Sequence, residues 1–405
     1  MKENLGLDFS QFRVEGNDEF YDYSRYIIVS NMNKEKMFLL APKNNGYTKG
    51  FERNAIQNII ENLGSISHEY IQNFRGFARD GELFVLIEAY EYSVYDLLYD
   101  NNYNHKPLPF DVAVEVIWRL AKAIEYLHTN GICHYDIRPE NMVFTLDSND
   151  IQCCKLGNFD RSLRSIENDI VFSLYGTPNY QSPERFERAF CDPKKADIWA
   201  FGVFIVTILT AKLPFTSKGS SLTYEEQYNI IKDQVLHQNI IEPFFSTELK
   251  NFLGMIFRPD PNSRATISDI IAHPFMEQIK KKVELLNKTS SSPLMCYINE
   301  RRAAGFEKKD IIKADIYQII TSRKPKDIFN ILMPYFKEGI SVVKSEGENN
   351  FVFNFKNGAV YSFKVFPHDG AEGTFTVYIN VRKRAKNDDF DLHLTKLTKI
   401  LQIPI

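Results

Sequence analysis

The stretch HYDIRPEN, residues 134–141, decides how the rest of this sequence is interpreted. It follows a segment over residues 111–129 in which apolar residues recur at the spacing of one helix face, and Gly131 provides a stop signal. The apolar stripe consists of Val112, Val116, Leu120, Ile124 and Leu127. We therefore expect an amphipathic helix followed by a loop that carries charged and amide side chains.

This loop resembles the catalytic loop of protein kinases, which reads HRDLKPEN in the family consensus. Phosphoryl transfer depends on positioning and charge neutralisation more than on covalent chemistry. The resemblance implies that Asp136 accepts the proton of the attacking hydroxyl group and that Asn141 helps to hold a metal ion. Arg138 stands where Ser/Thr kinases have a lysine near the transferred phosphate. The alternative is a chance match in a helix–loop segment.

Four further segments resemble kinase motifs in the family's order, which makes a chance match negligible. They are KLGNFDRS (155–162), GTPNYQSPE (176–184), ADIWAFGVFIVTILTAKLPF (196–215) and RPDPNSRATISDIIAHPF (258–275). The resemblance implies a buried Glu184–Arg264 pair and a supporting role for Asp197 under the catalytic loop. It also implies that Thr177 contacts the catalytic aspartate and marks Ser/Thr specificity; the alternative is a plain loop threonine.

The predicted fold class is α+β: a two-lobed protein kinase fold with a β-rich N-lobe and a helical C-lobe, then a small α+β C-terminal domain. The predicted bounds are 8–280 for the kinase domain (N-lobe 8–88, C-lobe 91–280), 281–319 for a linker and 320–405 for the C-terminal domain. The polar break NKTSSSP, residues 287–293, suggests the linker. GTPNY places the chain nearest the calcium/calmodulin-dependent, AMP-activated and microtubule-affinity-regulating kinases.

The N-lobe matches the family less well. Kinases cover the nucleotide phosphates with a glycine-rich loop, and the run here is GNDEFYDY, in which Asp18 and Tyr21 replace two glycines. The resemblance places the following residues at the ATP site: Val14, Gly16, Phe20, Lys43, the Glu88 carbonyl group and the Tyr90 amide group. Lys43 could instead be a solvated lysine after a strand. The helix glutamate that kinases pair with this lysine has no clear counterpart, because Ile56 to Ile60 includes no acid.

The metal-binding aspartate of the family is replaced by Asn158. The implied metal ligands are therefore Asn141 and Asn158, and Mg²⁺ prefers charged oxygen ligands to a neutral amide. Tyr135 also replaces the arginine that precedes the catalytic aspartate in the family. We predict an ATP site with weak or lost Mg²⁺ binding and a catalytically impaired kinase. The alternative is an active ATP-dependent Ser/Thr protein kinase.

The C-terminal segment resembles the kinase-associated domain of the same subfamily, which binds acidic phospholipid and restrains the kinase domain. Strands are expected at 350–355, 359–366 and 374–381, and a closing helix at 390–401. The basic run 382–386 suggests an anionic membrane surface as a partner; the alternative is an edge strand protected by charge. A protein substrate or a regulated partner protein is the other expected partner.

Composition limits the remaining choices. The chain has 405 residues and a net charge of −3, so no global attraction to nucleic acid is expected. Its five cysteines do not form a disulfide framework, which favours a reducing compartment. The longest apolar run, residues 201–209, is too short to span a bilayer and is expected to be a core helix. We therefore expect a cytoplasmic protein.

Overall fold

The computed structural model divides the chain into two compact units. One comprises residues 1–218 and 223–309, and the other comprises residues 219–222 and 310–405. The structure describes residues 11–19, 23–42, 55–80, 82–98, 105–145, 154–164, 178–186, 192–215, 229, 233–234, 245–288, 292–303, 316–321, 328–330, 332–333, 340–345, 350–355, 360–367 and 375–383. Each unit is described by itself below.

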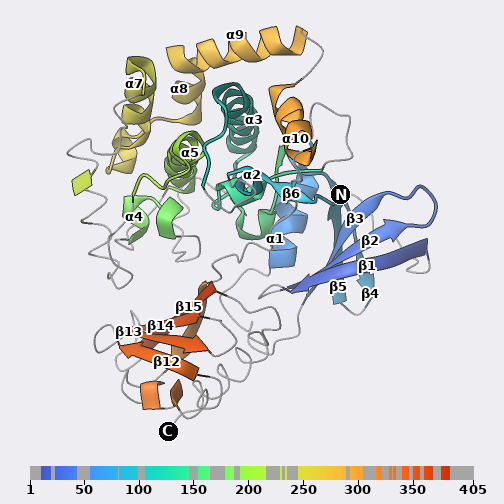
Figure 1. Cartoon of the computed structure of the whole chain (residues 1–405). Coiled ribbons are helices and arrows are strands. Elements are labelled where there is room, and N and C mark those ends of the chain that lie inside the picture. Colours follow the sequence, from blue (N-terminus) through green and yellow to red (C-terminus); the bar gives the residue numbers. More distant parts are fainter. Residues whose placement is uncertain are drawn as a thin grey trace. The chain divides into compact units, whose positions relative to one another are not determined.

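The first unit begins with a five-stranded antiparallel sheet in the order β1-β2-β3-β5-β4 (Figure 1). Its strands are β1 (Phe12–Glu19), β2 (Tyr23–Ser30), β3 (Lys36–Pro42), β4 (Phe74–Asp80) and β5 (Glu82–Glu88). Side chains alternate between two faces. The inner face joins the main core through Phe38, Leu40 and Ile87. The outer face holds a separate cluster of Ile28, Met37, Leu39 and Leu86.

One helix, α1 (Ala55–Asn62), packs against the inner face of this sheet. Its apolar residues Ile56 and Ile59 are buried in the main core. The spacing of three residues puts both on one helix face, which is why this short helix packs as it does. This helix contains the run from Ile56 to Ile60 in which the sequence shows no acid.

The rest of the first unit is mainly helical and is built around α3 (Phe110–Thr129) and α5 (Pro193–Thr210). Its short strands are β6 (Tyr92–Ser93), β7 (Ile132–Cys133), β8 (Met142–Phe144), β9 (Lys155–Leu156) and β10 (Leu163–Arg164). The α3 helix confirms the prediction for residues 111–129. The α5 helix is buried almost throughout, as expected for a core helix, and Trp199 at its centre has no exposed surface. Gly202 allows α5 to approach its neighbours, because an added Cβ there would lie 2.5 Å from Ile256. The remaining helices are α2 (Val94–Leu97), α4 (Pro183–Phe186), α7 (Thr247–Ile256), α8 (Ile267–Ala272), α9 (Pro274–Lys288) and α10 (Pro293–Ala303).

The kinase-like segment 258–275 contains the end of one helix and the start of another. The backbone of His273 is extended, with φ −70° and ψ 141°, so α8 ends there and α9 begins at Pro274. The physical reason is that a proline disfavours the helical conformation of the residue before it. The sequence HPF contained this signal.

The predicted linker, residues 281–319, is wrong in its first half. The α9 helix continues to Lys288 and α10 packs against α3, so the first unit extends to Lys309. The tie is a buried carboxylate: Glu115 accepts hydrogen bonds from the Ser292 hydroxyl group at 2.6 and 2.7 Å and from the Leu294 amide at 3.0 Å. A carboxylate at a helix N-terminus accepts otherwise unpaired N–H groups, and it is favoured by the helix dipole.

The second unit contains a five-stranded antiparallel sheet in the order β11-β15-β14-β13-β12. The strands are β11 (Ile316–Thr321), β12 (Ile340–Ser345), β13 (Asn350–Phe355), β14 (Val360–Pro367) and β15 (Phe375–Lys383). The three predicted strands thus correspond to β13, β14 and β15. The closing helix predicted at 390–401 lies outside the described residues.

The β15 strand lies between β11 and β14 along Phe375–Asn380, and the edge-strand alternative for the basic run stays a prediction. Within the described residues, the last pair between β15 and β11 is Asn380 with Ile316, and Lys383 pairs with Val360 of β14. Arg382 and Lys383 are the last two residues of β15; Arg384 and Lys386 lie outside the described residues. Among the helices that the structure describes, none has the length and apolar character needed to cross a membrane.

Candidate active site

The predicted catalytic loop is held by one buried aspartate. The carboxylate of Asp197, on α5, accepts hydrogen bonds from the backbone amides of His134 at 2.8 Å and Tyr135 at 2.7 Å. His128 at the end of α3 lies 3.0 Å from the same carboxylate. Tyr135 has a positive φ of 63°, a conformation that few residues other than glycine adopt. Asp197 thus satisfies the amides of a tight, strained turn, as the resemblance implied.

Three predicted catalytic residues meet directly after this turn. Asn141 donates from Nδ2 to the Asp136 carbonyl group at 2.6 Å and to Asp136 Oδ2 at 2.9 Å. Arg138 Nε lies 3.4 Å from Asp136 Oδ2. A carboxylate, a cation and an amide are therefore brought together, as the resemblance to the kinase catalytic loop implied. Asn141 is placed by the short 3₁₀ turn η3 (Pro139–Asn141).

The charge state of Asp136 follows from its neighbours. Burial of the carboxyl group opposes ionisation, but the nearby Arg138, Arg161 and His134 and the hydrogen bond from Asn141 outweigh it and lower the pKa of Asp136 to about 2. The same proximity to Asp136 outweighs burial at Arg138 and raises the pKa of that guanidinium group. Asp136 is therefore an anion and Arg138 a cation at neutral pH.

Asn158 occupies the position of the metal-binding aspartate, and it faces Asn141. Its Nδ2 donates a hydrogen bond to Asn141 Oδ1 at 3.2 Å. Its backbone adopts a left-handed conformation, with φ 66° and ψ 67°, which asparagine and aspartate tolerate better than most residues. The two predicted metal ligands are thus brought together, but their amide groups bind each other.

Phe159 and the turn that it begins are anchored to α1. The Phe159 ring is fully buried and packs edge-on against His134, with ring centroids 4.9 Å apart. Asn58 Nδ2 of α1 donates to the Asp160 carbonyl group at 3.0 Å, and Asn62 Nδ2 donates to the carbonyl group of Ser162 at 3.0 Å. Hydrogen bonds from two buried asparagines therefore join the helix to the start of the segment that follows Phe159.

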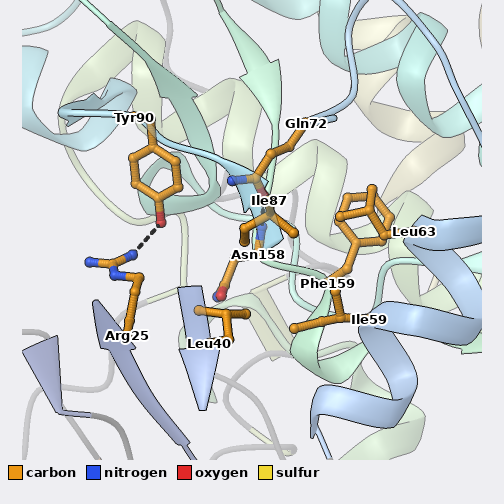
Figure 2. A pocket seen from close by; sticks show the side chains of 9 residues that line it. All are labelled: Arg25, Leu40, Ile59, Leu63, Gln72, Ile87, Tyr90, Asn158 and Phe159. Atoms are coloured by element: carbon orange, nitrogen blue, oxygen red, sulfur yellow. Dashed lines mark hydrogen bonds between the residues drawn. The ribbon is translucent and has the colours of Figure 1, made fainter. Parts of the chain in front are cut away.

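A pocket lies between the sheet of the first unit, α1 and Asn158 (Figure 2). It is lined by Arg25, Leu40, Ile59, Leu63, Gln72, Ile87, Tyr90, Asn158 and Phe159. The α1 residues at the pocket are apolar, so α1 presents Ile59 there and not a carboxylate. These observations explain why no helix glutamate could be assigned from the sequence.

The hinge residue Glu88 is held by both its side chain and its backbone. Its carboxylate pairs with Lys155 of β9 (Lys155–Leu156) at 2.8 Å and accepts the Asn73 amide at 2.9 Å. Its carbonyl group, predicted to face adenine, accepts a hydrogen bond from Gln72 Nε2 at 2.7 Å. Tyr90, the second predicted hinge contact, does line the pocket.

Other predicted nucleotide contacts are not brought to the pocket. Val14 is 60% exposed and pairs with Ile28, whose side chain belongs to the outer cluster of the sheet. Val14 therefore lies on the outer face of the sheet, away from the pocket. Gly16 follows a bulge and pairs with Ile27, on the inner face. Phe20, Lys43 and Thr177 lie outside the described residues.

Sequence reasoning missed two polar side chains of the pocket, Arg25 and Gln72. Arg25 had a signal: it interrupts the inward-facing series of β2, in which Ile27 joins the core. A charged residue at such a register position is unusual. Gln72 had none, because its role depends on the Glu88 carbonyl group, which only the folded chain brings near it.

The predicted structural pair is present as well. Arg264 donates from Nη1 and Nη2 to the two carboxylate oxygens of Glu184, both at 2.8 Å. The Arg264 side chain is fully buried and its guanidinium carbon lies 5.0 Å from the centre of the Trp199 ring. Tyr135, which replaces the family's arginine, is buried. The guanidinium carbon of Arg185 lies over its ring, 3.8 Å from the ring centre.

Comparison with known proteins agrees with this geometry. A family model described as protein kinase domain matches residues 28–276. The chain is 29% identical over 226 residues to the Serine/threonine-protein kinase TIO of Arabidopsis thaliana, covering 56% of this chain and 16% of that protein. It is 27% identical over 222 residues to an Aurora kinase of Eremothecium gossypii, covering 55% of this chain and 56% of that protein. It is 30% identical over 194 residues to CBL-interacting protein kinase 30 of Oryza sativa subsp. japonica, covering 46% of this chain and 37% of that protein.

The matched part of this chain thus spans between about a sixth and somewhat more than half of the length of these relatives. All three are named as kinases, and the similarity falls on the unit that contains the catalytic loop, the Asp197 support and the Glu184–Arg264 pair. Since the family model also covers more than half of the chain, this chain belongs to the protein kinase family.

Proposed function

We propose that this chain is a catalytically impaired member of the Ser/Thr protein kinase family that acts by binding or regulating a partner protein. The observation that carries the proposal is the hydrogen bond from Asn158 Nδ2 to Asn141 Oδ1. Mg²⁺ requires hard oxygen ligands in near-octahedral geometry. Here the family's charged ligand is a neutral amide, and the oxygen of its partner amide is already engaged. This donor set fits Mg²⁺ poorly.

Two further observations support the proposal. The pocket-facing residue of α1 is Ile59, so this helix supplies no carboxylate to the nucleotide site. By contrast, the interactions that stabilise the fold, at Asp197, Glu184 and Arg264, are complete. A protein that acts by binding needs an intact fold but does not need a complete metal site. The fold by itself does not decide the activity, because function depends on the residues of the site.

The test is to restore the carboxylate with Asn158→Asp, a change that the left-handed backbone accommodates. Thermal stability is measured with ATP, with and without Mg²⁺, and phosphotransfer is measured on a generic peptide. We expect Mg²⁺ to add almost nothing to ATP binding in the wild type. In the variant Mg²⁺ should add a clear increment and phosphotransfer should rise at least tenfold, because the ion neutralises charge that develops on the γ-phosphate.

The matched control is Asn262→Asp, which makes the same charge change at an exposed position of the 3₁₀ turn η6 (Pro261–Ser263). It should leave the Mg²⁺ increment unchanged. Tight and strictly Mg²⁺-dependent ATP binding by the wild type would overturn the impaired reading and establish the alternative, an active ATP-dependent kinase that phosphorylates protein hydroxyls.

We also propose that the second unit contacts an anionic membrane surface through residues 382–386. The supporting observation is that Arg382 and Lys383, the described part of the basic run, are the last two residues of β15. Binding to vesicles that contain anionic lipid should fall as salt rises, because the attraction decays over a Debye length of about 8–10 Å.

In this assay Arg382→Ala with Lys383→Ala should weaken binding several-fold, and Lys364→Ala on β14 serves as the control. Equal binding to neutral and anionic vesicles would refute the membrane proposal without touching the kinase proposal.

A further inference from the structure

On the inner face of the sheet, the cation Arg25 lies beside apolar side chains that join the main core, among them Phe38 and Leu40. Arg25 pairs across the strands with Leu40, and both line the pocket. The Arg25 guanidinium carbon lies 4.4 Å from the centre of the Phe38 ring and 5.5 Å from that of Tyr90. Its Nη1 donates to Tyr90 Oη at 3.0 Å, the dashed contact in Figure 2. Two rings and a hydroxyl group therefore retain the cation inside the pocket.

Gln72 closes the opposite side. Gln72 is 2% exposed, and both polar atoms of its side-chain amide are bound. Nε2 donates to the Glu88 carbonyl group at 2.7 Å, and Oε1 accepts a hydrogen bond from the backbone N–H of Asn158 at 3.3 Å. An adenine bound as the family binds it would use the same carbonyl group for its amino group. Gln72 therefore competes with the base for its principal hydrogen-bond acceptor.

Little space remains between these side chains. The cavity has a volume of about 10 Å³, roughly what a single water molecule needs. Sites that hold small molecules measure roughly 300–1,000 Å³. A purine could enter only after Arg25 left its aromatic contacts and Gln72 released the Glu88 carbonyl group.

We propose that Arg25 and Gln72 are the specificity-determining residues of this pocket, which exclude a purine base by occupying its place and its hydrogen-bond acceptor. This proposal rests on the proposed function only because it concerns the same site. It acts on the base, whereas Asn158 acts on the metal and phosphates, and the two effects are separable.

The experiment uses adenosine, which has no phosphate and needs no metal, with the full chain. Calorimetric titration compares the wild type with Arg25→Val, Gln72→Val and the double variant. Valine suits a strand and an apolar face. We expect the wild type to bind adenosine only weakly, each single variant to gain about tenfold and the double variant more. The control Arg13→Val removes an exposed arginine from β1 of the same sheet and should change nothing.

Each outcome decides the proposal. Wild-type affinity for adenosine equal to that of a folded double variant would overturn it, even if Asn158→Asp restored the Mg²⁺ increment as expected. If the double variant does not fold, Tyr90→Phe replaces it, since this change removes only the hydroxyl group that holds Arg25. A gain of severalfold in adenosine affinity would then support the proposal, and no gain would overturn it.

Discussion

Arg264→Ala is expected to lower the free energy of unfolding of the kinase unit by about 3–5 kcal/mol, the usual result of removing one partner of a buried ion pair. Glu184 would keep its charge at 4% exposure with no cation in place of Arg264. The guanidinium group also donates to the carbonyl groups of Arg258 at 2.9 Å and Lys195 at 2.8 Å, and these acceptors would lose a donor as well.

Tryptophan fluorescence during urea unfolding measures this loss for one unit. Both tryptophans of the chain, Trp118 and Trp199, lie on α3 and α5 of the first unit. The matched control is Arg75→Ala, which breaks the exposed pair with Glu35 at 2.6 Å. Exposed pairs contribute roughly 0–1 kcal/mol. Equal losses in the two variants would show that the buried pair does not stabilise the fold as argued.

Asp136→Ala is expected to abolish the phosphotransfer that Asn158→Asp restores, a loss of about 10²–10⁴-fold, the usual contribution of a positioned general base. The pKa of Asp136 is lowered to about 2, so the carboxylate is ionised at neutral pH and can accept a proton from a hydroxyl group. The contribution of this ionised group to stability is present above its unfolded pKa and is lost as the pH falls toward 2.

The measurement compares Asn158→Asp with Asn158→Asp plus Asp136→Ala on the same peptide. Asp136→Asn is the isosteric control: it keeps a carbonyl oxygen for the Asn141 amide but cannot accept the proton, so it should be equally inactive. Fluorescence unfolding verifies that both variants remain folded. Activity retained by either variant would remove Asp136 as the base.

Much of the kinase unit was determined by the sequence alone. Helix periodicity depends only on near neighbours, so the segment at residues 111–129 predicted α3 within one residue of its start. The loop residues Asp136 and Asn141 lie five positions apart, so their meeting required only a local turn. The Glu184–Arg264 pair came from the resemblance, and the fold places it as implied. Strand alternation likewise predicted β13, β14 and β15.

Other features depended on residues far apart in the chain. Glu115 and Leu294 are 179 positions apart, and no local pattern indicated that α10 would pack on α3 through a carboxylate. Arg25 and Tyr90 are 65 positions apart, and only the sheet register brings the cation to the ring.

The physical reason is that a sequence pattern predicts which face of a helix or strand is buried, but not which distant residue a side chain will contact. Composition and periodicity show which face of an element is apolar, because burial follows from average surroundings. A hydrogen bond requires donor and acceptor within about 3 Å in a defined direction. That condition depends on register, bulges and helix packing together. The sequence therefore determined that this chain is a kinase fold with Asn158 at the position of the family's metal-binding aspartate, and only the tertiary structure decided that Arg25 and Gln72 line the pocket beside it.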